Sequence, residues 1–341
     1  MFSIVFAGFA PAQAIAMPAP LAAFQAQLSA LTLRAPGRVG IAIEDVTTGV
    51  TTGINSGSEM PAASTIKIPV MVEVFRQLVA GRFDLNTRLH LQRSDKDWGS
   101  GDLADARVGG SYPVSHLLSL MIDDSDNTAT NMLIRLVGRA QINETMTELG
   151  LTHTRLTDFI RSEGPHIRWA LRSSPADMAH LLDSMAKEQL IDEWSSREMI
   201  AILRGQRHNG LLPAPLPVGT EIAHKTGTLH DTLNDVGIVY LGTDPYVIAV
   251  MTTDLPTLDS GRRYIRGVSL MAYEALGKFA SWREDNDFTP VAANAPAVQP
   301  AQPVMTGSGA PDIPMWTPQN PAAAPASAAA PAASPEPQTG G

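Results

Sequence analysis

The sequence predicts an α/β (α+β) fold, in which one antiparallel sheet flanked by helices carries an inserted all-helical subdomain. Strand-like patterns lie near both ends of the globular part, within residues 39–54 and 222–253. Helical apolar spacing fills the interval between them, and a further helical pattern follows over residues 261–279. Strands from such distant segments must pair across the helical insertion. The predicted parts are a sheet part, residues 21–60 and 206–283, and a helical part, residues 61–205.

The first sheet segment reads as a helix followed by a hairpin. A helix over residues 21–33 is predicted from the spacing of its apolar side chains, Leu21, Phe24, Leu28 and Leu31. Residues 39–46 alternate toward strand character, and Thr48-Gly49 then turn the chain into a second strand over residues 50–54.

The middle of the chain is helical in pattern. We expect one helix over residues 64–79, ended by Gly81. Strong apolar stripes predict helices over residues 115–122 and 128–137. A Ser-Pro pair opens another helix over residues 174–185.

The last part of the globular region returns to strands. Three are predicted, over residues 222–228, 236–241 and 246–253, with Asp244-Pro245 in the turn between the last two. The helix over residues 261–279 then closes the domain.

Composition excludes several classes of function. The 341 residues suffice for a sizeable core, and a net charge of −9 without a basic patch argues against a nucleic-acid partner. The absence of cysteine excludes disulfides and thiol catalysis. The eight histidines show no paired-ligand spacing, so no metal and no cofactor is predicted.

Both ends of the chain differ from the globular part. Residues 1–20 hold a short apolar run followed by small residues, which predicts a signal peptide and an extracytoplasmic location. No Lys or Arg precedes this run, which leaves open a truncated start, and an apolar disordered segment is the alternative. Residues 289–341 contain 12 of the 26 prolines and are predicted to be a disordered tail. No stretch has the length of a membrane span, and we expect a monomer.

The chemistry centres on Ser64 and Lys67. Residues at i and i+3 share one face of a helix, so Lys67 can reach the Ser64 hydroxyl. A serine hydroxyl needs a neighbouring base to attack at neutral pH, and a lysine with a lowered pKa can be that base. This S-x-x-K pattern alone is weak, because a helix cap followed by a surface lysine has the same spacing.

Two further motifs follow in a fixed order, Ser125-Asp126-Asn127 and Lys225-Thr226-Gly227. S-x-x-K, S-D-N and K-T-G are the signature set of the penicillin-recognising serine enzymes. The flanks at residues 127–133 and 234–239 extend the match, so that about residues 25 to 282 resemble class A β-lactamases. The resemblance implies a β-lactamase/transpeptidase-like fold with the active site between its two parts.

The resemblance and the chemistry together assign the site residues. Ser64 is the nucleophile, Lys67 its base, and Ser125 the hydroxyl that carries a proton to the leaving nitrogen. The substrate-binding residues are Asn127, Lys225, Thr226, Gly227 and Thr228. Lys225 attracts a substrate carboxylate, and Gly227 leaves room for a ligand backbone. By resemblance, the N–H groups of Ser64 and Thr228 form the oxyanion hole.

The sequence departs from the class A pattern at the loop that normally carries the deacylating glutamate. The loop is about two residues shorter, no E-P-x-L-N occurs, and Ile160 falls where the glutamate belongs. Glu163 is a possible deacylation base if the shortening moves it inward. The salt bridge that closes this loop in the family is also missing, and a reversed Asp158–Arg172 pair is one substitute.

One more family residue is absent, the arginine on the strand after K-T-G. Substitutes from the final helix are Arg262, Arg263 and Arg266. A class A-like chain without the glutamate resembles a group of class A-related penicillin-binding proteins, which act on D-alanyl peptides and are acylated by penicillins.

Three functions remain open at this point. The first is a D,D-peptidase-like serine acyl hydrolase, acylated by β-lactams or D-alanyl peptides and slow to deacylate. The second is a true class A β-lactamase that uses Glu163 or another water activator. The third is a penicillin sensor or binding module without turnover.

Overall fold

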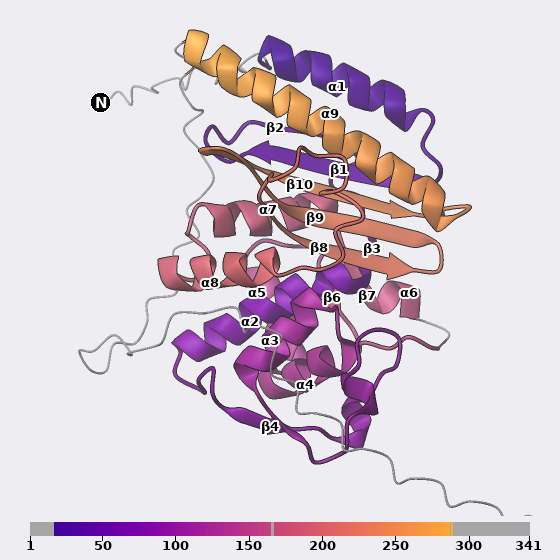
Figure 1. The fold of residues 1–341 in the computed structure, drawn as a ribbon, viewed down its shortest axis with the longest axis vertical. Coiled ribbons are helices and arrows are strands. Elements are labelled where there is room, and N and C mark those ends of the chain that lie inside the picture. Colours follow the sequence, from indigo (N-terminus) through magenta and orange to yellow (C-terminus); the bar gives the residue numbers. More distant parts are fainter. Residues whose placement is uncertain (1–16, 165–166, 287, 289–341) are drawn as a thin grey trace, which may run out of the picture. The chain divides into compact units, whose positions relative to one another are not determined.

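A five-stranded antiparallel sheet in the order β2-β1-β10-β9-β8 forms the framework of the computed structural model (Figure 1). The strands are β1 (Arg38–Asp45), β2 (Thr51–Ile54), β8 (Ile222–Leu229), β9 (Thr232–Leu241) and β10 (Asp244–Thr253). The N-terminal hairpin therefore pairs with strands about 200 residues later, and β1 lies beside β10 from Arg38↔Thr253 to Asp45↔Tyr246. This confirms the predicted sheet.

The structure describes residues 17–164, 167–286 and 288. Residues 1–16 of the predicted signal peptide and the predicted tail, residues 289–341, lie outside this range. The first helix begins at Ala19, inside the segment predicted as signal peptide. No helix in the described ranges is both long and apolar enough to cross a membrane.

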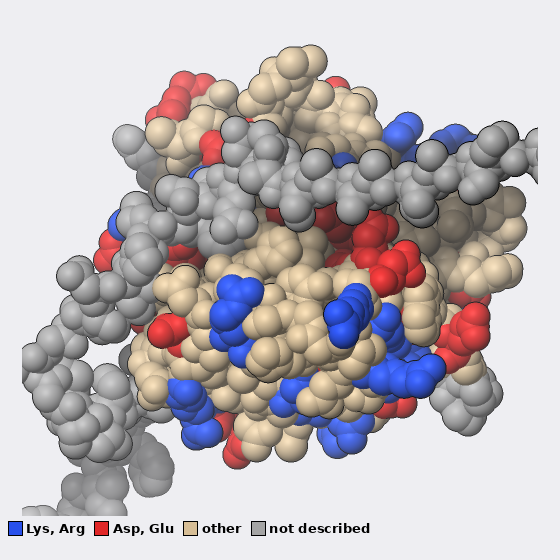
Figure 2. All heavy atoms as spheres, turned by 60° about the horizontal axis from the view of Figure 1, so that its bottom comes forward, with Lys and Arg blue, Asp and Glu red and all other residues tan. Residues whose placement is uncertain are grey.

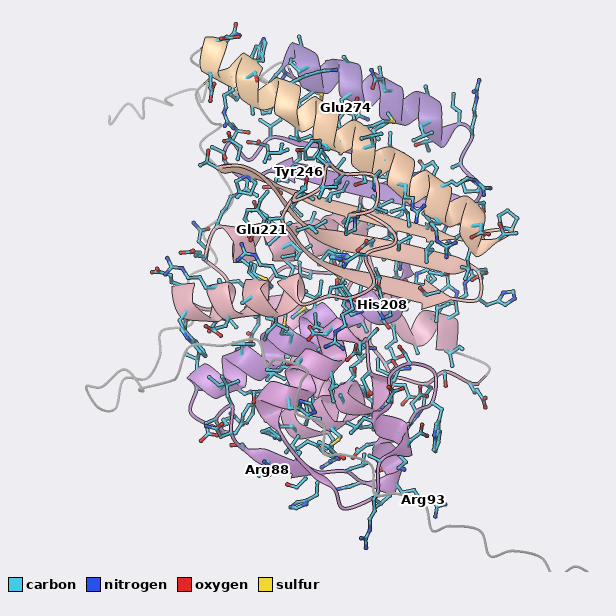
Figure 3. All side chains as sticks on the ribbon, viewed as in Figure 1. Arg88, Arg93, His208, Glu221, Tyr246 and Glu274 are labelled. Carbon is cyan, nitrogen blue, oxygen red and sulfur yellow. The ribbon has the colours of Figure 1, made fainter. Side chains whose placement is uncertain are left out.

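Two helices, α1 (Ala19–Thr32) and α9 (Leu258–Asp285), lie side by side over one face of the sheet (Figure 1). The apolar side chains that predicted α1 are the buried ones, Leu21, Phe24 and Leu28. Helix α9 is longer than predicted, because Thr257 caps its N-terminus by accepting a hydrogen bond from Ser260 N. The core between these helices and the sheet includes Tyr246, which Figure 3 shows within the sheet layer.

Helix α7 (Pro175–Ala186) covers the opposite face, and the helical part lies beyond it (Figure 1). The longer helices of that part are α2 (Lys67–Val79), α3 (Val114–Asp123), α4 (Asn127–Val137), α5 (Arg139–Glu148) and α8 (Glu193–Arg204). Helix α2 is at its centre, since eleven of its residues are buried. Lys and Arg side chains gather on the outer face of this part (Figure 2).

Short elements connect the larger ones. They are β3 (Met60–Pro61), β4 (Arg88–His90), β5 (Ser111–Pro113), β6 (Arg155–Leu156), β7 (Leu171–Ser173), α6 (Ile167–Ala170) and the 3₁₀ turns η1 (Ala63–Ile66), η2 (Arg93–Asp95) and η3 (Leu103–Asp105). Strand β7 pairs with both β3 and β6, so the segment before η1 is tied to the two ends of the 157–170 loop.

Two further predictions were wrong. The predicted helix over residues 64–79 is η1 followed by α2, so Ser64 lies in a 3₁₀ turn and caps no helix. The i and i+3 positions are eclipsed in a 3₁₀ turn, which keeps Ser64 and Lys67 on one side. Asp244-Pro245 lie in β10 rather than in the turn, because Gly242, at φ 60°, makes the turn and Leu241 pairs with Asp244.

The packing predicts a large loss of stability for Phe279→Ala. This side chain is fully buried in the α9 layer, with its ring 6.0 Å from Trp282 and 5.8 Å from Phe288. Removing a buried aromatic ring costs about 3–5 kcal/mol of unfolding free energy. Chemical denaturation of Leu270→Ala, at a 39% exposed position of the same helix, provides the control, with a change near about 0.5 kcal/mol. Equal losses in the two variants would contradict this account of the core.

Candidate active site

The edge strand β8 presents the K-T-G segment. Among the described strands it pairs with β9 alone, and the turn at His230-Asp231 is closed by the pair Leu229↔Thr232. Hydrogen-bonded and non-hydrogen-bonded pairs alternate in an antiparallel ladder, so the backbone N–H of Thr228 points to the free edge. The strand therefore offers a backbone donor beside whatever binds along it.

Ser64 lies against this edge strand because Gly227 has no side chain. A Cβ on Gly227 would stand 2.9 Å from Ala62 O and 3.1 Å from Ser64 N. Contacts that close would push η1 away from β8, which is the physical reason for glycine here. The two predicted oxyanion donors, Ser64 N and Thr228 N, thus belong to adjoining segments.

Asn234 holds the chain just before Ser64. Its Nδ2 donates to Pro61 O at 2.9 Å and Ala62 O at 3.1 Å, while its Oδ1 accepts from Thr252 N at 3.0 Å. The side chain is fully buried between β9 and η1. It therefore fixes the segment that carries Ser64 to the sheet, a role the motifs did not reveal.

Two site residues have strained backbones. Ala63, directly before Ser64, has φ 49°, and Ser125 has φ 57°. Non-glycine residues at positive φ are uncommon and cost of order 1–3 kcal/mol each. Such strain persists where surrounding contacts fix the conformation, and here it occurs in two of the three motif segments.

Lys67 is fully buried and donates to the S-D-N segment. Its Nζ hydrogen-bonds Ser125 O, Ser125 Oγ at 3.0 Å and Asn127 Oδ1 at 2.8 Å. Within the described residues, no hydrogen bond joins Lys67 Nζ to Ser64 Oγ, although the two share one side of the turn. Ser64 itself is partly exposed.

Ser125 Oγ joins the two buried lysines. Lys225 Nζ donates to it at 3.0 Å, the same distance as Lys67 Nζ, and also to Thr226 O at 3.0 Å. Two lysines that are distant in sequence thus donate to one serine hydroxyl. The structure brings Lys67, Ser125 and Lys225 together as the motifs predicted.

Burial lowers the pKa of both lysines. It holds the pKa of Lys67 well below its usual value, and the charge of Lys225 adds to the effect. Burial also lowers the pKa of Lys225 to about 7, against the opposing charges of Asp235 and Asp123. Two like charges around one buried hydroxyl repel each other, so a neutral lysine is favoured here.

The S-D-N segment is fixed by the helix that follows it. Asp126 caps α4 by accepting from Ala129 N at 2.7 Å, and its second oxygen accepts from Leu103 N at 2.9 Å. Asn127, the first residue of α4, turns its Oδ1 to Lys67 and its Nδ2 to Asp97 Oδ1 at 2.7 Å. No sequence motif marks Asp97.

The short loop of residues 157–164 lies against α4. Ile160 is buried, and Asn131 holds its backbone from both sides, Ile160 N to Asn131 Oδ1 at 2.8 Å and Asn131 Nδ2 to Ile160 O at 3.1 Å. Glu163 is exposed, and within the described residues no hydrogen bond joins its carboxylate to Lys67 or Ser125.

The loop is not closed by the suggested Asp158–Arg172 pair. Asp158 lies 3.7 Å from Arg139 and Arg172 lies 3.6 Å from Glu59, so that hypothesis was wrong. The sequence could not show that Arg139 of α5 lies near Asp158, or that Glu59, just before β3, lies near Arg172.

Two of the three suggested substitute arginines on α9 make other contacts. Arg262 pairs with Asp259, and Arg266 Nε donates to Gly210 O at 2.8 Å. No contact in the described residues joins either of them to Lys225 or Thr226.

A loop at residues 206–209 ties two motifs together. Gln206 Nε2 donates to Ile122 O at 2.8 Å, near the S-D-N segment. At the other end Asn209 Oδ1 is 3.0 Å from His224 Nε2, and His224 Nδ1 is 2.9 Å from Asp235. Figure 3 shows His208 of this loop at the boundary between the sheet part and the helical part. The loop thus fixes the distance between Ser125 and Lys225.

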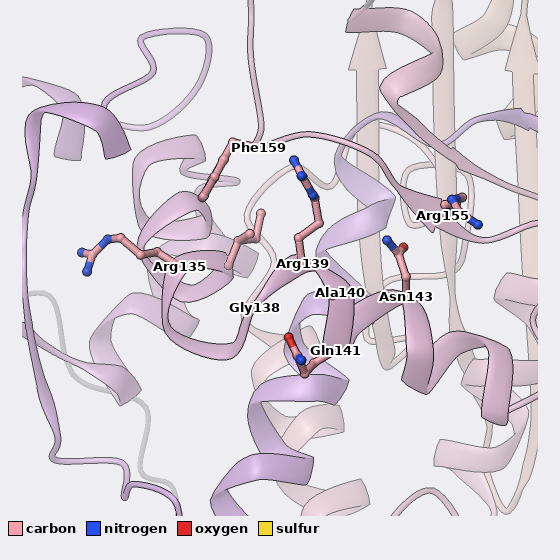
Figure 4. A pocket seen from close by; sticks show the side chains of 9 residues that line it. Arg135, Gly138, Arg139, Ala140, Gln141, Asn143, Arg155 and Phe159 are labelled. Carbon is pink, nitrogen blue, oxygen red and sulfur yellow. The ribbon is translucent and has the colours of Figure 1, made fainter.

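A separate cavity of about 670 Å³ lies on the helical part and contains none of the motif residues (Figure 4). Its lining includes Arg135, Arg139 and Phe159. Arg135 pairs with Asp95 at 2.9 Å and extends away from Arg139, so the guanidinium groups do not converge on one ligand (Figure 4). The chemistry of the chain lies at the motifs instead.

Several solved structures have a similar overall fold. PBP-A is 32% identical, with a TM-score of 0.71 over 76% of this chain and 97% of that chain. A PBP-A variant with a leucine replaced by glutamate, an acyl-enzyme complex with penicillin G, matches at 31% identity and a TM-score of 0.71, covering 77% and 100%. A β-lactamase from Sphaerobacter thermophilus is 31% identical, with a TM-score of 0.68, covering 76% and 97%.

The family assignment agrees with the site. The model of the "Beta-lactamase enzyme family" matches residues 23–276, which include all three motifs and both parts of the fold. The chain belongs to the beta-lactamase enzyme family, within the superfamily of penicillin-recognising serine hydrolases.

Proposed function

We propose that this protein forms an acyl-enzyme at Ser64 with β-lactams and D-alanyl peptides, and that it is a D,D-peptidase-like hydrolase with slow β-lactam deacylation. One observation carries the second half of the proposal. In the described residues, the hydrogen-bond partners of Lys67 Nζ are two oxygens of Ser125 and the amide oxygen of Asn127, and none is a carboxylate.

Acylation follows from the lysine–serine arrangement. A neutral Lys67 takes the hydroxyl proton of Ser64 as Ser64 Oγ attacks the carbonyl carbon of the amide. Ser125 Oγ, in hydrogen-bond contact with both lysines, passes a proton to the leaving nitrogen. The N–H groups of Ser64 and Thr228 receive the oxyanion, whose charge they stabilise without reorganisation.

Substrate binding uses the edge of β8 and Asn127. A charged Lys225 attracts the carboxylate that penicillins and D-alanyl peptides share. One N–H of Asn127 is committed to Asp97, which leaves the other for a substrate carbonyl. D-alanyl peptides are part of the cell wall, so we also propose an extracytoplasmic location.

Deacylation requires a base that activates water. The two carboxylates near Lys67 are unsuited, because Asp97 and Asp126 each accept hydrogen bonds at both oxygens. At the position where class A enzymes carry the glutamate, Ile160 has no titratable group. A positioned base contributes about 10²–10⁴ to proton transfer, and its loss slows this step accordingly.

The Sphaerobacter β-lactamase favours a second candidate, a true β-lactamase, since it is about as similar to this chain as PBP-A. That function needs Glu163 to move inward from its exposed position. A penicillin-binding module without any turnover is the third outcome that kinetics can reveal.

Ser64→Ala should abolish labelling by a fluorescent penicillin, because no other described hydroxyl has the same place against β8. The fold should persist, since Ser64 is partly exposed and caps no helix. Ser29→Ala, at an exposed position of α1, is the matched control and should label fully. Undiminished labelling of the Ser64 variant would refute the assignment of the nucleophile.

The fall in the rate constant of acylation at alkaline pH should follow the loss of charge on Lys225. The lysine binds an anion only when charged, so the second-order rate constant of acylation should fall as the pH rises through about 7, the pKa of Lys225. Lys225→Arg keeps its charge, and its profile should lack this fall. A wild-type rate constant that still rises between pH 7 and 9 would contradict this role.

Turnover of penicillin should show a burst of one equivalent and a slow steady state. If a β-lactamase works near the median of about 10 s⁻¹, losing the base leaves about 10⁻¹ to 10⁻³ s⁻¹. Intact-protein mass spectrometry should then detect the penicilloyl adduct for about ten seconds to many minutes.

The same measurement separates the candidates. Hydrolysis at tens per second, stopped by Glu163→Gln while the burst remains, would establish a β-lactamase with Glu163 as base. An adduct that never decays would establish a binding module.

A further inference from the structure

Asp97 connects three segments around the catalytic lysine. One oxygen, Oδ1, accepts from Asn127 Nδ2 at 2.7 Å and Gly99 N at 3.0 Å. The other, Oδ2, accepts from Ser162 N at 2.7 Å and Ser162 Oγ at 3.0 Å. The residue is 6% exposed and its bond from Asn127 is buried, whereas Gly99 and Ser162 lie at exposed positions.

The backbone of Asp97 is fixed as well. Asp97 N donates to Thr128 Oγ1 at 3.1 Å, and Thr128 Oγ1 lies 3.2 Å from Asp97 O. Thr128 follows Asn127 on α4. The carboxylate is therefore held at a set place beside the S-D-N segment.

The first consequence concerns the orientation of Asn127. An amide group has a donor end and an acceptor end, and either end can face Lys67 unless a neighbour distinguishes them. A carboxylate accepts only, so Asp97 attracts the NH₂ end of Asn127 and turns its oxygen to Lys67 Nζ at 2.8 Å. The second N–H of Asn127 remains for substrate.

The second consequence concerns the loop. Gly99 packs so closely that an added Cβ would lie 2.3 Å from Ser162 Cβ and 3.1 Å from Asn127 Nδ2. Loop residues before Ser162 are held by Asn131 at Ile160. Asp97 therefore holds the 157–164 loop at Ser162, close to the point where Asn131 of α4 holds it at Ile160.

Asp97 is ionised but is not a base. Burial favours its neutral form, yet the hydrogen bonds from Asn127, Ser162 and Gly99 outweigh burial and lower its pKa. Both oxygens are already bonded to donors, so no site remains for a reacting water.

We propose that Asp97 is a positioning residue for acylation, which sets the amide orientation of Asn127 beside Lys67 and holds Ser162 of the short loop. This inference rests on the proposed acyl-enzyme at Ser64. Asp97 acts through Asn127 and touches neither substrate nor nucleophile.

The test is a double-mutant cycle on acylation by a fluorescent penicillin, with binding and acylation resolved by stopped flow. Asp97→Ala should lower the second-order rate constant about 10- to 100-fold, the range expected when a reacting group is displaced. In an Asn127→Ala background the same change should cost less than about 3-fold, because the group that Asp97 orients is already gone.

Three further variants separate positioning from folding. Asp102→Ala, at an exposed position of the connection between η2 and η3 that also contains Asp97, should acylate like the wild type. Ser162→Ala removes one of the four bonds to the carboxylate and leaves Asn127 held, so it should stay within about 3-fold. Asp97→Asn preserves the shape of the side chain, but its single acceptor oxygen can serve either Asn127 or Ser162 and not both. Its loss in the rate constant of acylation should therefore be intermediate. This variant replaces Asp97→Ala in the cycle if Asp97→Ala does not fold.

The outcomes that overturn the proposal are distinct. An unchanged rate constant in Asp97→Ala, or an equal loss with and without Asn127, would show that Asp97 does not act through Asn127. A loss in Ser162→Ala as large as that in Asp97→Ala would assign the effect to the loop alone. Wild-type protein that is not labelled at Ser64 would instead overturn the proposed function.

Discussion

The placement of two fully buried lysines around one serine hydroxyl is the constraint on which the site depends. Lys67 and Lys225 each lie 3.0 Å from Ser125 Oγ. Burial and mutual repulsion disfavour two charges there, so the arrangement favours a neutral amine that can accept a proton. Lys67 Nζ donates to two oxygens of Ser125 and to Asn127 Oδ1, and Lys225 Nζ donates to Ser125 Oγ and Thr226 O, so nearby oxygens offset part of the cost of burying both amines.

This arrangement requires parts of the chain that are distant in sequence to be held at short distances. The edge strand approaches Ser64 closely because Gly227 lacks a side chain. Asn234 ties the segment before Ser64 to the sheet, and the 206–209 loop ties Ser125 to the strand of Lys225. Positive φ at Ala63 and Ser125 shows that these ties hold a strained backbone in place.

The loop beside α4 gives the site its specific character. In place of a carboxylate that could reach Lys67, the structure has a buried Ile160 and an Asp97 whose two oxygens serve Asn127, Gly99 and Ser162. The groups proposed to attack an amide are thus present, whereas the partners of Lys67 include no carboxylate that is free to activate water. The proposed difference between acylation and deacylation has this physical origin.

The sequence alone determined the fold class, most helices and strands, and the residues of the three motifs, because apolar periodicity and motif order are local signals. It placed Ser64 in a helix that proved to be a 3₁₀ turn, and it suggested an Asp158–Arg172 pair that does not form. Asp97 and the 206–209 loop carried no signal, and the family-like flank at Asn234 did not show its contacts, since these partners lie 15 to 173 residues away. Only the tertiary structure decides such contacts, because a hydrogen bond between distant segments depends on the packing that brings them together.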